Sequence, residues 1–517
     1  MELRAAATSA VDGNAGESSQ EVSWRVHWPF RYMIFFLGHL TNVLSYADRT
    51  NISLAILPMR AELGLGDYAE GACLSAFFVG YATTQIIGGL LTLRYGSKAV
   101  LCGALGLCSL TTLSTPVAAR TSFALLIAAR VALGAAEGCL LPALHALAIK
   151  WAPLKERTTA AALQTSGQYV GSCVALLCGG LAATSWPALF YMFGAGGVGW
   201  LMLFATLGSS RPDLHRCVTA AELAHIREGK LRLACSDYAQ ATSLPRTRAN
   251  PAPDASEASG SADLRELRSA HRGGAHPVPW RRLLTNRACL AIYVSLATHN
   301  WSWYLLLSWL PTFLTQEQGV DLAAAGSLSL LPYVLAASCS NLGAAVADRL
   351  MLSRWQWSAT RTRKVINLAG QLGPCVALFA LALTSTTSSS MHGEHAEGVA
   401  GPQTSTSTAA ALTEVSPRVS PGPVVSAALA AMAIGSGALT QAGCWSNMMD
   451  VAPRHVSVLL GIANTLGTLP GIICNLLTGA MLSAGWGWRA VFALGCLMEI
   501  IGATVYGLLA SGEDQDF

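Results

Sequence analysis

Hydrophobic and polar residues alternate along the chain in long blocks rather than residue by residue. A helix that spans a membrane needs about 20 predominantly apolar residues. Six such runs precede residue 210, and six more follow a polar stretch in the middle of the chain. The predicted spans are 30–57, 70–93, 98–118, 122–149, 158–183, 187–208, 288–314, 322–348, 364–385, 423–448, 455–482 and 488–511. The pattern therefore predicts an all-α integral membrane protein with twelve transmembrane helices in two six-helix halves.

The longer polar stretches divide the chain into segments. We expect an N-terminal tail, a first half, a linker, a second half and a C-terminal tail, over residues 1–29, 30–208, 209–286, 287–511 and 512–517. The linker is rich in Arg, Ser, Ala and Pro, but its piece 219–230 is typical of a short surface helix, in which Thr219 and Glu222 form a capping box. Segment 386–421 is of low complexity and is expected to be disordered.

The composition agrees with a membrane protein and argues against several other classes. Hydrophobic residues make up 52% of the chain and charged residues only 12%, whereas soluble proteins carry about a quarter charged residues. A net charge of +4 is too small to indicate a nucleic-acid partner. The 14 cysteines are scattered singly without ligand spacing, so they are expected to be small buried side chains. We expect no metal and no other cofactor, and a monomer.

Lysine and arginine predict the orientation. One set of loops holds most of them, including Lys98, Lys150 and Arg361, and the linker is basic as well. By the positive-inside rule these loops, the linker and both termini face the cytosol or its equivalent. The first 29 residues lack an apolar signal core and carry acidic residues, unlike a transit peptide. The membrane itself stays open between plastid, plasma and vacuolar or endosomal membranes.

The two halves repeat each other weakly. Segment 151–171 matches 451–471 at an offset of 300. An Ala-Pro pair, two glycines and a Gln-Thr or Asn-Thr pair fall at equivalent positions of the two segments. Segment 88–98 likewise matches 343–353. Transporters built from two parallel halves carry their substrate between those halves, near the middle of the membrane. The repeat thus predicts a transporter with a central path.

A few ionisable residues interrupt the apolar runs. The first predicted span contains Asp48 and Arg49, and the fourth contains Arg130, Glu137 and His145. The seventh contains His299 and the twelfth Glu499. Charged side chains within spans cost roughly 2.5–3.5 kcal/mol each and usually face the protein interior. These residues are therefore candidates for function.

The spacing of these charges fits coupled transport of an anion. Arg130 and Glu137 are seven residues apart and share one helix face, two turns from each other. A fixed cation would attract the anion, and a carboxylate would bind a coupling proton or help to bind sodium. Asp48 and Arg49 point about 100° apart, so only one is expected to face the path.

A structural interpretation is also open, in which both arginines only pair with Glu137 and Asp48 and hold the helices together. For Glu499 the structural role is favoured. His145 and His299 can relay protons or simply bond within the core. Polar neighbours that can line the path are Gln164, Gln168, Tyr169, Asn341, Asn447 and Asn464.

The same stretches carry a family resemblance. They include "ADRTNISLAILPM" (47–59), "EGCLLPALHALAIKWAPLKER" (137–157), "HNWSWYLLLSWLPTF" (299–313) and "SNMMDVAPRHVSVLLGIANTLGTLPG" (446–471). The chain resembles the anion:cation symporters of the major facilitator superfamily, a family that holds sodium/phosphate cotransporters, sialin and vesicular glutamate transporters. It is most similar to the plant and algal plastid-type phosphate and organic-anion transporters.

This resemblance implies proton- or sodium-coupled transport of phosphate or an organic anion. Arg49, Arg130, Glu137 and His145 fall on positions that the family uses for binding and coupling. We therefore expect Arg49, Arg130, His299, Gln164 and Asn447 to bind substrate, and Glu137, His145 and Asp48 to serve coupling.

The chain also departs from the family. Leu74 and His299 stand where vesicular glutamate transporters have a histidine and an arginine, which argues against a dicarboxylate substrate, and Met448 replaces a histidine. The superfamily's loop signature retains Arg94, but Leu93 replaces its aspartate, while the second half keeps Asp348 and Arg349. These three residues, Arg94, Asp348 and Arg349, are the expected gating contacts.

Pumps, membrane enzymes, channels and sensors are the other function classes open to a membrane protein of this kind. The chain has no G-x-x-x-x-G-K-[ST] loop and no HExxH motif, which argues against an ATP-driven pump or a membrane enzyme. A passive anion channel or a non-transporting sensor remains the alternative. The expected partners are a small anionic substrate and the lipid bilayer. The sequence leaves the anion and the coupling ion, H⁺ or Na⁺, undecided.

Overall fold

A computed structural model of the chain describes residues 29–153, 156–226, 279–385, 422–453 and 455–515. The regular elements in these ranges are helices. The first half contains α2 (Phe30–Leu63), α3 (Asp67–Tyr95), α4 (Ser97–Thr121), α5 (Phe123–Gly138), α6 (Leu140–Trp151), α7 (Arg157–Leu177), α8 (Gly179–Thr184) and α9 (Trp186–Leu207). The second contains α12 (Trp280–Thr285), α13 (Arg287–Gln316), α14 (Leu322–Leu328), α15 (Leu331–Ala345), η3 (Val346–Arg354), α16 (Ala359–Thr384), α17 (Pro423–Gly437), η5 (Ala438–Gln441), α18 (Cys444–Val451), α19 (Val456–Ser483) and α20 (Gly487–Leu509).

The long helices account for the predicted spans. Within the described ranges, nine segments are long and apolar enough to cross a membrane, three of them made of consecutive helices such as α5 and α6. Three further long helices, α2, α7 and α13, carry more polar side chains. Together these segments give the twelve-span architecture that the hydrophobic pattern predicted. The segments 1–28, 227–278 and 386–421, whose disorder or linker role the sequence suggested, lie outside the described residues.

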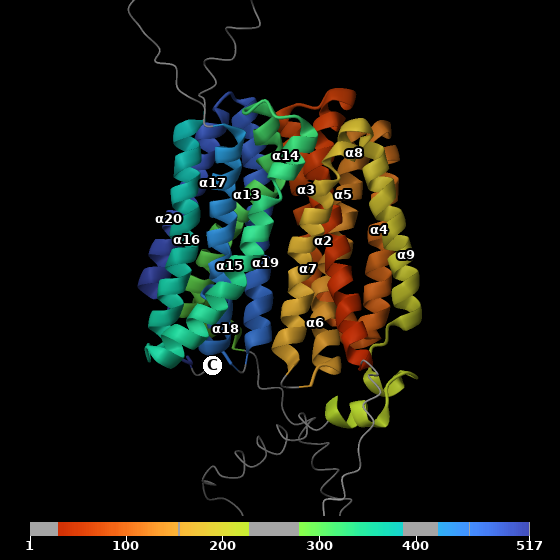
Figure 1. Cartoon of the computed structure of the whole chain (residues 1–517), viewed down its shortest axis with the longest axis vertical. Coiled ribbons are helices and arrows are strands. Elements are labelled where there is room, and N and C mark those ends of the chain that lie inside the picture. Colours follow the sequence, from red (N-terminus) through yellow and green to blue (C-terminus); the bar gives the residue numbers. More distant parts are fainter. Residues whose placement is uncertain (1–28, 154–155, 227–278, 386–421, 454, 516–517) are drawn as a thin grey trace, which may run out of the picture.

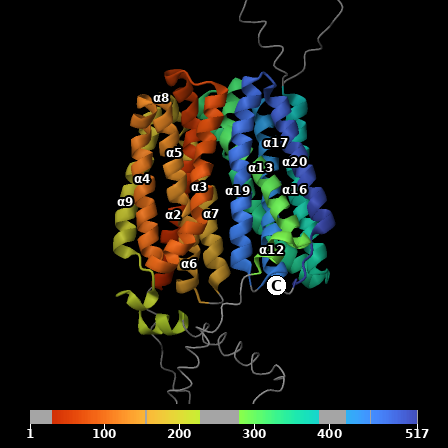
Figure 2. The same ribbon diagram turned by 180° about the vertical axis from the view of Figure 1, so that it is seen from behind.

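The helices form two bundles that lie side by side (Figures 1 and 2). Helices α2 to α9 pack together in one bundle, and α13 to α20 in the other. Between the bundles α3 packs along α19, α2 contacts α13, and α8 contacts α14. Residues 209–226 and the C-terminus lie at one end, here called the linker end, which the basic loops predict to be cytosolic. Helix α16 finishes and α17 begins at the opposite, far end.

At the far end the two bundles are joined by a buried carboxylate. Glu70, near the start of α3, is fully buried and bonds to Arg60 of α2 at 2.5 Å. Its other oxygen accepts a hydrogen bond from the Thr312 hydroxyl of α13 at 2.8 Å. The next residue, Gly71, meets Gly479 of α19 and brings the two backbones together, because a β-carbon on Gly71 would lie 3.1 Å from the Gly479 Cα. The far end is thus closed in this conformation.

At the linker end a clamp ties the linker to the first bundle. Arg31 of α2 donates two hydrogen bonds to the Glu156 carboxylate, from Nε at 2.8 Å and from Nη2 at 3.0 Å. The Glu222 carboxylate accepts from the backbone amides of Phe30 at 3.1 Å and Arg31 at 2.9 Å. Glu222 therefore caps the N-terminus of α2 from the linker, where the free amides of a helix favour an anion.

The predicted capping box in the linker forms only in part. Residues 220–226 are helical, and the Thr219 hydroxyl accepts from the Glu222 amide at 3.2 Å. The Glu222 carboxylate does not return to Thr219 but caps α2 instead, because folding brings an uncapped helix start within its reach. The rest of the predicted helix, 227–230, lies outside the described residues.

We expect the clamp to weaken in acid. Hydrogen bonds from Arg31 hold the pKa of Glu156 below its usual value of about 4.5. Because the folded pKa is the lower one, the clamp contributes its full stability above about pH 4.5 and loses it as the pH falls through the folded pKa. Glu156→Gln should cost about 0.5–1 kcal/mol at pH 7, since the pair is partly exposed and screened.

The measurement is thermal unfolding of wild type and Glu156→Gln in detergent, at pH 7 and at pH 3.5. The variant should lie below wild type at pH 7 and converge with it in acid. A difference of equal size at both pH values would show that the charge of Glu156 does not stabilise the fold.

Candidate functional site

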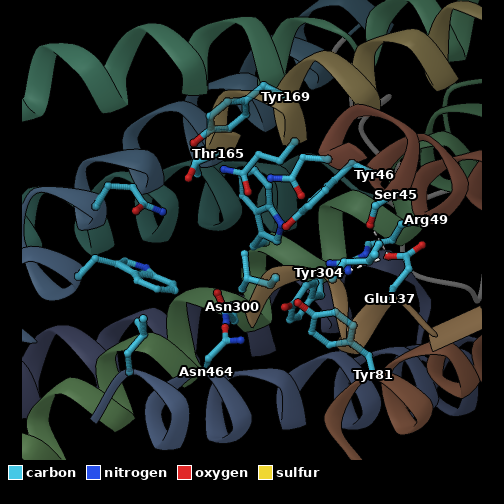
Figure 3. A pocket seen from close by; sticks show the side chains of 18 of the residues that line it. Ser45, Tyr46, Arg49, Tyr81, Glu137, Thr165, Tyr169, Asn300, Tyr304 and Asn464 are labelled. Atoms are coloured by element: carbon cyan, nitrogen blue, oxygen red, sulfur yellow. Dashed lines mark hydrogen bonds and ion pairs between the residues drawn. The ribbon is translucent and has the colours of Figure 1, made fainter. Parts of the chain in front are cut away.

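A cavity of about 390 Å³ lies between the two bundles. The first bundle lines it with α2, α3, α5, α6 and α7, and the second with α13, η5, α18 and α19. The three polar long helices, α2, α7 and α13, supply half of its lining residues, so their polarity is explained by the cavity they face. The charged and histidine side chains in the lining are Arg49, Glu137, His145 and His299. Figure 3 shows Arg49 and Glu137 among them.

The cavity lies where one helix of each bundle is interrupted. The fourth span breaks between α5 and α6 at Cys139, and the tenth breaks between α17 and α18 over 438–443. These breaks correspond under the 300-residue offset of the repeat. Breaks at matching positions of two repeats mark binding sites in transporters, because they free backbone groups and side chains beside the path. Glu137 precedes the first break, and Ala438 and Gln441 lie in the second.

Arg49 and Glu137 form the charged centre of the cavity. Arg49 Nη2 lies 3.1 Å from Glu137 Oε2, which also accepts a hydrogen bond from the Ser45 hydroxyl at 2.7 Å (Figure 3). Arg49 Nε and Glu137 Oε1 are buried without a hydrogen-bond partner in the described part of the chain. A guanidinium has five N–H donors, so Arg49 retains donors for an anion while it is paired.

Aromatic rings surround the guanidinium. Its central carbon lies 4.6 Å from the ring centres of Tyr46 and Tyr81, and 4.7 Å from that of Phe77. A planar cation stacks favourably on such rings and is thereby held in one orientation. The rings also exclude water, which strengthens the attraction between Arg49 and an anion.

Arg130 and Asp48 lie behind the cavity rather than in its lining. Arg130 is buried, and its guanidinium carbon is 5.5 Å from the ring centre of Phe77, the ring that Arg49 also contacts. Asp48 is buried on the other face of α2 from Arg49, close enough for its charge to attract that of Arg130. Of these two adjacent residues, Arg49 lines the cavity and Asp48 does not. Arg130, predicted to bind substrate, is not among the lining residues in this conformation, and its Nε and Nη1 are buried without a hydrogen-bond partner in the described residues.

Of the other predicted residues, some line the cavity and some do not. His299 and His145 line the cavity, as do the polar neighbours Gln168, Tyr169 and Asn464. Gln164 is buried against Gly38 and does not line it. Asn447 lies within the second bundle, where it donates to the Tyr506 hydroxyl at 3.0 Å. Asn341 is exposed and bonds to its own helix.

Several lining residues were not predicted from the sequence. Tyr46, Tyr81, Asn300 and Tyr304 point into the cavity (Figure 3). Asn300, Trp303 and Tyr304 follow His299 at the spacing of one helix face, so the helical period of α13 was a usable signal. Nothing in the local sequence of α3 distinguished Tyr81 from its apolar neighbours.

Amide and hydroxyl groups join the bundles beside the cavity. Asn464 Nδ2 donates to Gln85 Oε1 at 2.7 Å, and Gln85 Nε2 donates to Thr468 Oγ1 at 3.0 Å. The ring centre of Phe78 in α3 lies 4.4 Å from that of Tyr304 in α13. The Phe78–Tyr304 contact lies between the cavity and the Glu70–Thr312 contact of the far end, whereas Gln85 and Asn464 lie nearer the linker end of α3 and α19.

The predicted gating residues make no contact between the bundles that the structure records. Arg94 is exposed and lies over the neighbouring Tyr95 ring at 5.3 Å, and Arg349 is exposed in η3. The Asp348 side chain lies outside what the structure describes. Ion pairs recorded at the linker end lie within one bundle or between it and the linker, as do Arg31 with Glu156 and, in the second bundle, Arg363 with Asp450 at 2.7 Å.

The sequence matches a known protein family over most of its length. Residues 39–393 match the model of the Major Facilitator Superfamily. The chain belongs to this superfamily. It is 30% identical over 500 residues to a probable chloroplastic anion transporter 4 of Oryza sativa, covering 96% of this chain and 71% of the relative. It is also 30% identical to a chloroplastic ascorbate transporter of Arabidopsis thaliana, covering 97% and 78%. A vesicular glutamate transporter 2.1 of Danio rerio is 27% identical, covering 94% and 75%.

Solved structures agree on the fold. A D-xylose–proton symporter superposes with a TM-score of 0.62 at 14% identity, covering 93% of this chain and 99% of that one. A bacterial homologue of the human lysosomal transporter Spinster, inward-facing and occupied, gives 0.58 at 17% identity, covering 93% and 97%. The predicted major facilitator fold is thereby confirmed, as is the predicted likeness to the anion transporters of the superfamily. The chain is a multi-pass membrane protein.

Proposed function

We propose that this major facilitator chain is a secondary active transporter that carries a small anion through the cavity between its halves, coupled to protons or sodium. One observation carries the proposal: a buried arginine, Arg49, and a buried carboxylate, Glu137, form an ion pair at the centre of the cavity, and each keeps a polar atom without a partner among the described residues. The relatives named as anion, ascorbate and glutamate transporters support the same function. A channel would not need a titratable group in such a pair.

The lining favours an organic anion that bears hydroxyl groups. The side-chain nitrogens of Asn42, Asn300 and Asn464 donate to Gln164 O, Gly467 O and Gln85 Oε1. Their amide oxygens accept no hydrogen bond within the described part of the chain, so these acceptors remain for donors on a ligand. Inorganic phosphate presents mainly acceptors, whereas a hydroxylated carboxylic or enolic acid presents hydroxyl donors.

The charge and size of the cavity point the same way. Arg49 is its one arginine, and Glu137 already neutralises part of it. One shared guanidinium matches a single negative charge better than the two of a dicarboxylate. A volume of about 390 Å³ falls within the range of small-molecule sites, about 300–1,000 Å³. We therefore propose a hydroxylated organic monoanion, ahead of phosphate, as the preferred substrate.

The test is uptake into liposomes that contain the purified protein. Radiolabelled ascorbate, phosphate and glutamate are offered under an imposed proton gradient and, separately, a sodium gradient. We expect ascorbate to be concentrated against its electrochemical gradient. Unlabelled phosphate should inhibit ascorbate uptake only weakly. Uptake that stops at equilibrium under every gradient would indicate a passive channel and overturn secondary active transport.

A further inference from the structure

A second buried carboxylate lies far from the charged centre of the cavity. Glu499, in the middle of α20, is fully buried. Neither of its carboxylate oxygens has a hydrogen-bond partner within the described residues. No ion pair of Glu499 is recorded either, whereas Glu70 and Glu137 both have arginine partners. The Arg49–Glu137 centre does not account for this residue.

Glu499 faces the inside of the second bundle. Glycines 495 and 502 lie one turn to either side of it and bring α20 against α13 and α16, since a β-carbon on Gly495 would contact Leu305 and Leu378. Ser302 of α13 lies next to Glu499. The titratable groups near it are thiols, Cys375 of α16 and Cys496 of α20, whose sulfur atoms are 3.2 Å apart. Helix α19 buries Cys474, which donates to the Trp301 carbonyl.

None of these neighbours carries a positive charge. A carboxylate ion that is buried without a cation is strongly disfavoured, and the single hydroxyl of Ser302, which lies close by but outside hydrogen-bond geometry, does not replace its hydration. Such a group escapes the cost by taking up a proton and remaining a neutral acid. In this conformation Glu499 is therefore a carboxylic acid that holds a proton.

One face of α13 connects this acid to the cavity. His299 lines the cavity, and Ser302 lies one turn further along the same face of the helix. His299 Nδ1 and Ser302 Oγ are both buried without a hydrogen-bond partner in the described residues. The imidazole ring and the hydroxyl can both accept and donate a proton. Together they form a polar route from the cavity, across α13, to the carboxyl group of α20.

We propose that Glu499 is a second proton-binding site of the transporter, loaded from the central cavity through His299 and Ser302. The proposal rests on the proposed function, because a proton carried here contributes only if the chain couples transport to protons. The acid releases its proton along the same route when the cavity changes sides and the surroundings of His299 become wet. Each proton that binds neutralises the carboxylate, and each release restores its charge.

Two measurements test the proposal with Glu499→Gln, which mimics the neutral acid. The first is infrared difference spectroscopy of the purified protein across a pH jump, which needs no substrate. We expect wild type to show a protonated-carboxyl band that Glu499→Gln lacks. Glu513→Gln is the matched control, because Glu513 is exposed near the same end of the chain, and its band pattern should equal that of wild type. A spectrum of Glu499→Gln with the band intact would overturn the proposal.

The second measurement is the number of protons carried per radiolabelled ascorbate, obtained in liposomes from the membrane potential at which net flux is zero. Glu499→Gln should retain exchange of internal for external ascorbate but carry one proton fewer than wild type and Glu513→Gln. An unchanged number would overturn the proposal even if the infrared band is present. If wild type exchanges none of the probe anions, the proposed function fails instead, and the infrared result still decides whether Glu499 holds a proton.

Discussion

Arg49→Ala and Arg49→Lys are both expected to abolish anion uptake while the protein still inserts and folds. Alanine leaves Glu137 buried without its cation, and breaking such a pair by removing one partner costs about 3–5 kcal/mol. Alanine also removes the two charge-assisted hydrogen bonds of a bidentate contact with the anion, each worth about 1.5–3 kcal/mol, so anion binding should weaken by at least about 100-fold. Lysine keeps the charge but not the planar donors that stack between Tyr46, Phe77 and Tyr81 and grip an anion in a bidentate way.

The measurement is initial uptake of radiolabelled ascorbate and phosphate into liposomes, with insertion checked by size-exclusion chromatography. Arg120→Lys is the matched control, because Arg120 is exposed at the far end, where it contacts Glu62 and the ring of Trp186 away from the cavity. Its uptake should equal that of wild type. Near-normal uptake by Arg49→Ala would remove Arg49 from the binding site.

The second large effect is expected at Glu137. Glu137→Gln should abolish accumulation against a gradient but leave exchange of internal for external anion. An arriving anion competes with Glu137 for Arg49, and a buried carboxylate that loses its cation takes up a proton. Anion binding and proton binding thereby favour each other, and this linkage is reciprocal. Glutamine keeps the shape and the contact with Ser45 but cannot take up a proton.

Uptake by wild type and Glu137→Gln is compared under separate proton and sodium gradients. For proton coupling, wild type concentrates the anion only under the proton gradient, and the variant under neither. A dependence on sodium at constant pH would instead place Glu137 in a cation site. Should Glu137→Gln concentrate the anion as well as wild type under both gradients, Glu137 only holds α2 to α5.

Much of this architecture was predictable because it depends on local chemistry. Apolar runs of sufficient length gave the spans, and helical geometry indicated that only one of Asp48 and Arg49 faces the path. Arg130 was assigned to the site because helix periodicity says which face a residue lies on but not what stands in front of it. The structure places Arg130 beside Phe77 of another helix and outside the cavity lining.

Long-range contacts account for the residues that were missed. The amides of Phe30 and Arg31 find their acceptor in Glu222, about 190 positions away, and no local pattern links them. Glu499 was predicted to be structural because it lies near the end of the chain, in a helix expected to be peripheral. The structure shows thiols and a hydroxyl beside it, and a buried carboxyl group with such neighbours is expected to hold a proton.

The glycine contact between α3 and α19 also determines how the two faces of the membrane differ. Gly71 and Gly479 meet backbone to backbone, so closing the far end requires no side chain to change its rotamer. A methyl group at either position would act as a wedge that holds this end apart. By population shift, such a wedge would strengthen apparent affinity for an anion that arrives from the far side and weaken it from the linker side. The pair thus helps to determine from which compartment the empty carrier collects its substrate.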